Sequence, residues 1–200
     1  MSIPSPQLPS PGRSSVLAPA LYLHGHDVDP ASVLALAAAL GAEVLAGPVV
    51  VGASVDEALV GEGLDRVDGP GRAWFEVGGG AGPACVFVRA STAVAGRVII
   101  GYSQGAALAF ALACDGSEPP AAVVCVAGFV ADDVDPARFA ASRLLVVHSD
   151  DDTVVDPFYG GLLARHAALA GASVTQLSYE GGHGWNDAAT ALVEAWLAAV

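Results

Sequence analysis

The sequence predicts an α/β protein in which a mostly parallel β-sheet carries helices on both faces. Two observations support this class. Short apolar segments, several of them almost continuous in Val, Ile and Leu, alternate with helical patterns along the chain, as expected for parallel strands buried on both faces. Three of the intervening segments open with Asp-Pro, a hydrogen-bond acceptor followed by the proline that suits a first helical position. Such alternation is typical of an open parallel sheet wrapped by helices.

Six strands are expected from the apolar segments, at 20–24, 43–50, 97–101, 121–127, 143–148 and 173–179. Helices should begin after the three Asp-Pro caps, at Asp29, Asp135 and Asp156. The first and third of these helices should end at Gly41 and Gly171. A last helix begins near Asn186 or Asp187 and has one apolar face, formed by Leu192, Val193, Trp196, Leu197 and Val200.

Two segments fall outside this alternation. Residues 1–16 are rich in Pro and Ser and lack an apolar core, which predicts a flexible tail rather than a signal peptide. We expect residues 17–200 to form a single domain. Residues 51–96 give the weakest pattern, and the GGGAG run at 78–82 follows no convincing strand, so we interpret it as a loop and not as a dinucleotide fingerprint.

The composition excludes several classes of function. Eight Arg and no Lys stand against 21 acidic residues, giving a net charge of −13 on a chain that is 54% hydrophobic. This charge disfavours binding to nucleic acids and to anionic membrane surfaces, because a protein needs basic patches to bind either of them. The most apolar stretch is interrupted by GYSQG, so no membrane span is expected. Three widely spaced cysteines suggest buried thiols and a cytoplasmic protein. The oligomeric state stays open, with a homodimer among the alternatives.

The segment RVIIGYSQGAALAFALAC, at 97–114, carries the strongest chemical signal. It reads as a buried strand, then Gly101-Tyr102-Ser103-Gln104-Gly105, then an Ala-rich helix, which is G-x-S-x-G in the strand–turn–helix context that gives the motif its meaning. The turn would raise Ser103 above the sheet, and side chains at the two glycine positions would collide with it. We therefore predict that Ser103 is a nucleophile.

A serine nucleophile requires a base and an orienting carboxylate, which follow it in the order Asp, then His. His183 lies between glycines after the last predicted strand and is the expected base. Asp150, Asp151 and Asp152 follow the preceding strand together. Their spacing after the strand slightly favours Asp152 as the orienting carboxylate, and the other two would then be residues of a solvated turn. The residues alone do not decide which of the three it is.

Two backbone N–H groups are expected to bind the developing oxyanion: that of Gln104, directly after the nucleophile, and that of His26, in the loop after the first strand. The polar residues of that loop could also suggest a metal site, but Asp29 is already explained as a helix cap. No metal and no cofactor are predicted.

These segments together resemble the phospholipase/carboxylesterase family of small serine esterases, an acyl-protein thioesterase-like branch of the α/β-hydrolase superfamily. The matching stretches are LHG at 23–25, GRAWFEV at 71–77, GYSQGA at 101–106, HSDDDTVVDP at 148–157 and GGH at 181–183. The resemblance implies an α/β-hydrolase fold and selects Asp152 as the catalytic acid. It also implies that Trp74 and Phe75 line the acyl-binding side of the site, although both could be plain core aromatics.

The chain departs from the family pattern in two places. Ser149 stands where the family usually has Gly, and the loop after Gly25 is short, with His26 at the oxyanion position. The compact chain leaves no room for a large lid domain. We predict a serine carboxylesterase that acts on short- to medium-chain acyl esters, small molecules, through Ser103, His183 and Asp152. The alternatives are an acyl thioesterase or lysophospholipase with the same triad, and a non-catalytic ligand-binding protein of this fold.

Overall fold

The computed structural model describes residues 20–50, 71–76 and 78–199. The predicted tail at 1–16 and Val200 of the last helix lie outside these residues. The main sheet contains six strands in the order β2-β1-β5-β6-β7-β8, and all neighbouring strands pair in parallel. These strands are β1 (Ala20–Leu23), β2 (Ala42–Leu45), β5 (Val98–Tyr102), β6 (Ala122–Val126), β7 (Arg143–Ser149) and β8 (Ser173–Tyr179).

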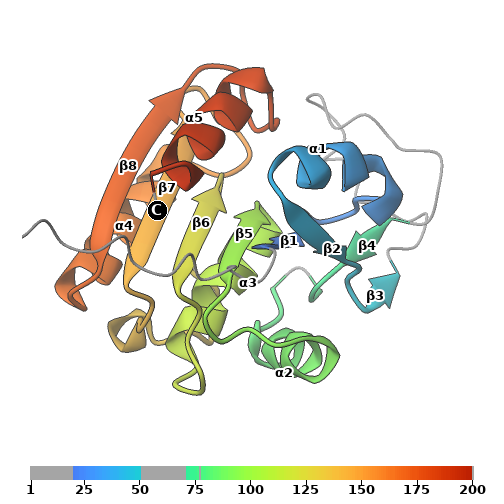
Figure 1. Cartoon of the computed structure of the whole chain (residues 1–200), viewed down its shortest axis with the longest axis vertical. Helices are drawn as coiled ribbons and strands as arrows, with labels where there is room; N and C mark the ends of the chain where they lie inside the picture. Colours follow the sequence, from blue (N-terminus) through green and yellow to red (C-terminus); the bar gives the residue numbers. More distant parts are fainter. Residues whose placement is uncertain (1–19, 51–70, 77, 200) are drawn as a thin grey trace, which may run out of the picture.

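Helices cover both faces of this sheet, which confirms the predicted class (Figure 1). Alternate strand residues point to opposite faces, so Ile99 packs in one apolar cluster and Ile100 in the other. The first face is covered by α2 (Gly82–Ser91), α3 (Gln104–Cys114) and α4 (Pro157–Leu169), and the second by α1 (Leu34–Ala39) and α5 (Asp187–Leu197). Every residue of α3 is buried, as expected for a helix that is apolar all round.

The Asp-Pro caps are present at all three predicted positions. The side chains of Asp29, Asp135 and Asp156 each accept a backbone N–H two residues later. Asn186, rather than Asp187, caps α5 by accepting the Ala189 N–H. Gly41 and Gly171 follow their helices with φ of +64° and +95°, the left-handed conformation expected at those ends.

One predicted helix is wrong in extent. The helix after Asp135 is only the 3₁₀ turn η3 (Pro136–Arg138), because the chain becomes extended at Phe139 and buries that ring 4.9 Å from Phe110. The first Asp-Pro likewise starts a 3₁₀ turn, η1 (Pro30–Val33), which leads directly into α1.

The strand expected at 43–50 is divided into β2 and β3 (Val49–Val50), which belong to different sheets. The division falls at Gly47, whose N–H donates to His24 Nε2 at 2.9 Å instead of to a neighbouring strand. Strand β3 pairs antiparallel with β4 (Arg72–Ala73) in a separate two-stranded sheet. Helix α2 was not predicted. Residues 78–81 of the GGGAG run form the expected loop, and Gly82 is already the first residue of the helix.

The fold brings the chemically interesting segments to one edge of the main sheet. Because all six strands run in the same direction, the residues after β1, β5, β7 and β8 emerge at the same carboxyl edge. The order of strands along the chain reverses between β1 and β5, and such a switch point is where open α/β sheets bind ligands. Ser103 follows β5 at this point. No helix in the described part of the chain is long and apolar enough to cross a membrane.

Candidate active site

Ser103 occupies a strained turn between β5 and α3. Its backbone has φ of +52° and ψ of −116°, a region that costs a non-glycine residue on the order of 1–3 kcal/mol. The two glycines of the motif allow this turn. A Cβ at Gly101 would overlap the carbonyl oxygen of Gly105, and a Cβ at Gly105 would overlap that of Leu23 in β1. The turn therefore lifts the Ser103 side chain above the end of the sheet.

The imidazole of His183 lies between Ser103 and Asp152. Its Nε2 is 3.0 Å from Ser103 Oγ, and its Nδ1 is 2.9 Å from Asp152 Oδ2. A carboxylate only accepts hydrogen bonds, so the proton of a neutral imidazole lies on Nδ1 and the Nε2 lone pair faces the hydroxyl. The serine hydroxyl therefore has a proton acceptor in contact with it.

The three neighbouring aspartates have different surroundings. The Asp152 side chain is fully buried, whereas Asp150 and Asp151 are exposed. Asp152 contacts the His183 imidazole, but Asp151 contacts the backbone of the same loop, accepting the N–H groups of Gly181 and Gly182 at 2.9 Å each. Asp151 thus lies in an exposed turn, as expected, and its side chain also binds the neighbouring loop.

Four donors converge on the Asp152 carboxylate. Its Oδ1 accepts the N–H groups of Val154 and Val155 at 2.9 Å each, from the turn that follows it. Its Oδ2 accepts His183 Nδ1 and also lies 3.2 Å from His148 Nε2. The carboxylate is thus held from three sides, and the imidazole of His183 meets an acceptor of fixed orientation.

His148 is a neighbour of the acid that the sequence did not indicate. Its Nε2 also lies 2.9 Å from the carbonyl oxygen of Val155. Both neighbours of Nε2 are acceptors, so this nitrogen carries the proton and shares it between them. Its Nδ1 is buried and has no hydrogen-bond partner among the described residues, and it packs against the backbone of Gly160 in α4.

Two tyrosine hydroxyls hold the loop that carries His183. Tyr102 donates to the carbonyl oxygen of His183 at 2.6 Å, and Tyr179 donates to that of Gly184 at 2.9 Å. Burial, and to a smaller extent the nearby Asp152 and Asp151 charges, raises the pKa of Tyr179 to about 12, so its hydroxyl keeps the proton that it donates. Burial likewise raises the pKa of Tyr102. The Tyr102 ring also lies 5.4 Å from the imidazole of His183.

The residues predicted for the oxyanion site lie on either side of the switch point. Gln104 is the first residue of α3, where backbone N–H groups have no acceptor within the helix. His26 lies in the turn after β1, the strand next to β5, and Asp27 in that turn has φ of +54°. Both residues therefore lie at the carboxyl edge that carries Ser103.

Trp74 and Phe75 are tied to the start of α3 by the Gln104 side chain. Its Oε1 accepts the Trp74 N–H at 2.8 Å, and its Nε2 donates to the Phe75 carbonyl at 2.7 Å. The Trp74 indole donates to the carbonyl oxygen of His24 at 2.8 Å and stacks on that imidazole. Both aromatic side chains are buried, so they belong to the core as well.

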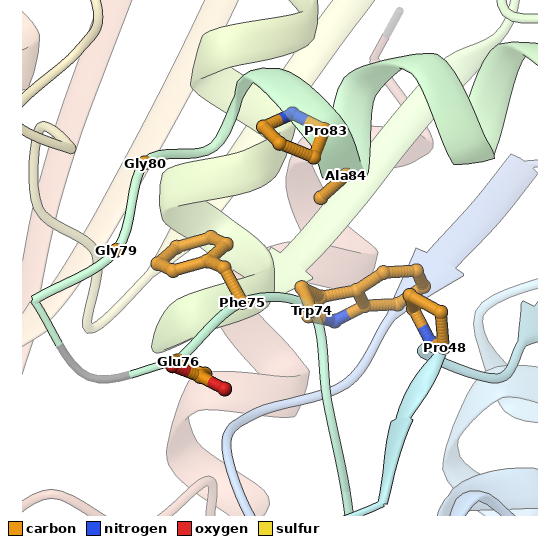
Figure 2. Close-up of a pocket in the computed structure, with 8 residues that line it drawn as sticks. All are labelled: Pro48, Trp74, Phe75, Glu76, Gly79, Gly80, Pro83 and Ala84. Carbon is orange, nitrogen blue, oxygen red and sulfur yellow. The ribbon is translucent and has the colours of Figure 1, made fainter.

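A pocket of about 320 Å³ lies against these two aromatic residues. Figure 2 shows Phe75 and Trp74 below Pro83 and Ala84, which lie in the first turn of α2, with Pro48 beside the indole. Glu76, Gly79 and Gly80 complete the lining, and among the described residues that line the pocket Ser103 and His183 are absent. The two aromatic residues therefore form a pocket wall and a part of the core at the same time.

The described residues contain no group of three or more His, Cys, Asp and Glu side chains arranged to hold a metal ion. In the loop after β1, Asp29 caps η1, and the two imidazole nitrogens of His24 contact the Gly25 carbonyl and the Gly47 N–H.

Comparison with known proteins identifies the fold. No protein-family model matches the chain, and no curated protein sequence matches it. Among solved structures, SOBER1 of Arabidopsis thaliana superposes with a TM-score of 0.66 at 20% identity, over 90% of this chain and 96% of that one. A carboxylesterase from Mesorhizobium loti has a TM-score of 0.66 at 21% identity, over 90% and 88%. The Bacillus cereus carboxylesterase has a TM-score of 0.68 at 16% identity, over 95% and 92%.

The chain thus has the α/β-hydrolase fold, in the form shared with these carboxylesterases, and no large lid domain is evident in its described part. This confirms the fold that the sequence resemblance implied. The level of identity fixes the fold alone, so the chemistry has to be argued from the residues of this chain.

Proposed function

We propose that the protein is a serine hydrolase that cleaves carboxylic esters through Ser103, His183 and Asp152. One observation carries the proposal: an unbroken chain of hydrogen bonds from Asp152 through the His183 imidazole to a serine hydroxyl on a strained strand–helix turn. Neither strain nor three converging polar side chains is needed for a stable fold, and strained residues cluster at functional sites.

The geometry supports a two-step acyl transfer. Ser103 Oγ attacks the acyl carbonyl while His183 Nε2 takes its proton, and the Asp152 carboxylate stabilises the imidazolium that forms. The backbone N–H groups of Gln104 and His26 bind the oxyanion, a contribution of about a hundredfold or more for each donor. His183 then returns the proton to the leaving alcohol, and a water activated by the same imidazole releases the acid.

The size of the pocket beside Trp74 and Phe75 supports the prediction that the acyl groups are of short to medium length. Its volume of about 320 Å³ lies at the lower end of the range for small-molecule sites, roughly 300–1,000 Å³. Its wall is attached through the Gln104 side chain to the residue that supplies one predicted oxyanion donor.

The test is hydrolysis of p-nitrophenyl acetate and butyrate by the wild type and by Ser103→Ala. We expect the substitution to lower kcat by at least about a thousandfold, because the nucleophile is removed while the binding surface remains. A fluorophosphonate probe should label the wild type at Ser103 and leave the variant unlabelled. Equal rates of hydrolysis in the two proteins would refute the proposal.

A chain-length series and matched substrates then define the acyl group and the leaving group. Ester, thioester and amide substrates with the same acyl chain separate the proposed esterase from a thioesterase with the same triad. A preference for the thioester at equal chain length would favour that alternative.

A further inference from the structure

The exposed carboxylate of Asp151 makes more contacts than its position in a turn would require. Its Oδ1 accepts the N–H groups of Gly181 and Gly182 at 2.9 Å each, and it also accepts the hydroxyl of Ser149. A carboxylate in a solvated turn would ordinarily be hydrated by water. Here one oxygen joins the turn after β7 to the loop after β8, directly before His183.

The backbone of that loop is shaped around the carboxylate. Gly181 and Gly182 have φ of +146° and +67°, conformations that a residue with a side chain rarely adopts. In these conformations two successive N–H groups converge on one acceptor, as in the concave backbone sites that bind anions. The glycines before His183 are therefore needed for this contact.

Ser149 completes the arrangement from inside the sheet. It is the last residue of β7 and is fully buried, with its hydroxyl directed to Asp151 and lying 3.3 Å from the carbonyl oxygen of Tyr179. The hydrogen bonds from Ser149 and then from the two glycine amides hold the pKa of Asp151 well below its usual range.

We propose that Asp151, supported by Ser149, is a positioning residue for the general base: it fixes His183 through the backbone of Gly181 and Gly182. This inference rests on the proposed function. Asp152 orients the imidazole itself, and the hydroxyls of Tyr102 and Tyr179 hold the carbonyl groups at His183 and Gly184. Asp151 accepts the N–H groups of the two glycines that precede His183, so hydrogen bonds hold the loop before this histidine as well as at and after it.

The test compares Asp151→Ala with Asp150→Ala. The two residues are adjacent, exposed and equally charged, so the control variant removes the same charge from the same turn. For p-nitrophenyl butyrate we expect Asp151→Ala to lower kcat about 10- to 100-fold with KM within about twofold, because small misplacements of a catalytic group have effects of this size. Asp150→Ala should stay within about twofold of the wild type in both constants. Asp151→Asn, which keeps an acceptor oxygen, should fall between them.

A second readout separates positioning from loss of structure. Titration with a fluorophosphonate probe counts the reactive serines, and its time course gives the rate for each site. We expect Asp151→Ala to keep the wild-type number of sites and to react at each site more slowly, by the same factor as the loss in kcat/KM. Ser149→Ala should act in the same direction, and it should add no further loss in the Asp151→Ala background, because residues that act through one contact are not additive.

Several outcomes would overturn the inference. Asp151→Ala could match Asp150→Ala in rate, or it could lose rate only in proportion to the number of reactive sites, which would make its role structural. If Asp151→Ala does not fold, Asp151→Asn against Asp150→Asn carries the comparison, with a loss of about threefold or more expected only for the former. A wild type that neither hydrolyses the ester nor reacts with the probe would instead refute the proposed function, and this inference with it.

Discussion

At the scale of single residues, adjacent positions with identical side chains have different roles. Asp150, Asp151 and Asp152 follow one another, yet the first is exposed, the second binds a neighbouring loop and the third is buried against two imidazoles. The difference arises from the direction in which each side chain leaves the turn after β7. Burial and the number of donors, rather than residue type, therefore distinguish the proposed catalytic acid from its neighbours.

Asp152→Asn tests this distinction. The side-chain amide would donate to His183 Nδ1 and leave a proton on Nε2, which could then no longer accept the Ser103 proton. We expect kcat to fall by about 10⁴-fold, the size of effect known for this change in other triads. Steady-state kinetics measures the loss, and circular dichroism checks that the variant is folded. A loss below about tenfold would contradict the assignment of Asp152.

At the scale of elements, α4 contains two consecutive glycines with opposite surroundings. A Cβ at Gly160 would lie 2.7 Å from His148 Nδ1, whereas a Cβ at Gly161 would meet nothing within 4 Å. Glycine weakens a helix interior, so only Gly160 has a packing reason to be there. The helix approaches β7 closely enough to hold His148 against the proposed catalytic acid.

These two positions give a matched pair of substitutions. Gly161→Ala should raise the free energy of unfolding by about 0.5–1 kcal/mol, through helix propensity and a less flexible unfolded chain. Gly160→Ala should lower it by about 1–3 kcal/mol, the usual cost of overpacking, and should reduce kcat by displacing His148. Urea denaturation and ester hydrolysis measure the two effects. Equal stability of the two variants would show that the contact with His148 is easily relieved.

At the scale of the whole molecule, the charged residues form a thin outer layer over an apolar interior that contains all three cysteines. Cys85, Cys114 and Cys125 are buried and free of disulfide bonds. Burial, followed by neighbouring charges, raises the pKa of Cys85 and of Cys114 to about 12. Burial also raises the pKa of Cys125. The thiols contribute to packing and offer very little thiolate.

The folded protein should therefore be inert to thiol reagents. At pH 8 a thiol with a pKa near 12 has about a thousandfold less thiolate than one near 9, and burial blocks access as well. A chromogenic disulfide reagent should titrate no thiol in the native protein within minutes. It should titrate three after unfolding in guanidinium chloride. A fast-reacting thiol in the native state would mean that one of these sites opens to solvent.

The sequence predicted the parts of the fold that local patterns determine. Five of the six strands and the caps at Asp29, Asp156 and Asn186 follow from apolar runs and from acceptors beside prolines or helix starts. Helix α2 could not be predicted from local patterns, because the residue that caps it is distant in the sequence. Asp133 accepts the N–H groups of Ala81 and Gly82 from some 50 residues further along the chain.

The candidate site shows the same limit. The turn at Ser103 and the order of His183 and the aspartates can be read from the chain, because strand ends and glycines mark them. The contact of Asp151 with Gly181 exists only once β7 and β8 are paired, and the contact of His148 with Asp152, four residues apart, depends on how the chain turns after β7. Sequence proximity alone gave no reason to separate Asp151 from a surface turn.

The attachment of Trp74 and Phe75 has an evolutionary consequence. The proposed reacting groups follow β5, β7 and β8 of one continuous sheet, whereas the pocket wall lies outside that sheet and meets it through the side chain of Gln104 and the backbone and ring of His24. The proposed reacting groups and the pocket wall therefore lie on different elements, linked through Gln104, His24 and the core that both share. If the proposed function holds, substitutions in the wall would alter which acyl groups fit without moving Ser103, His183 or Asp152.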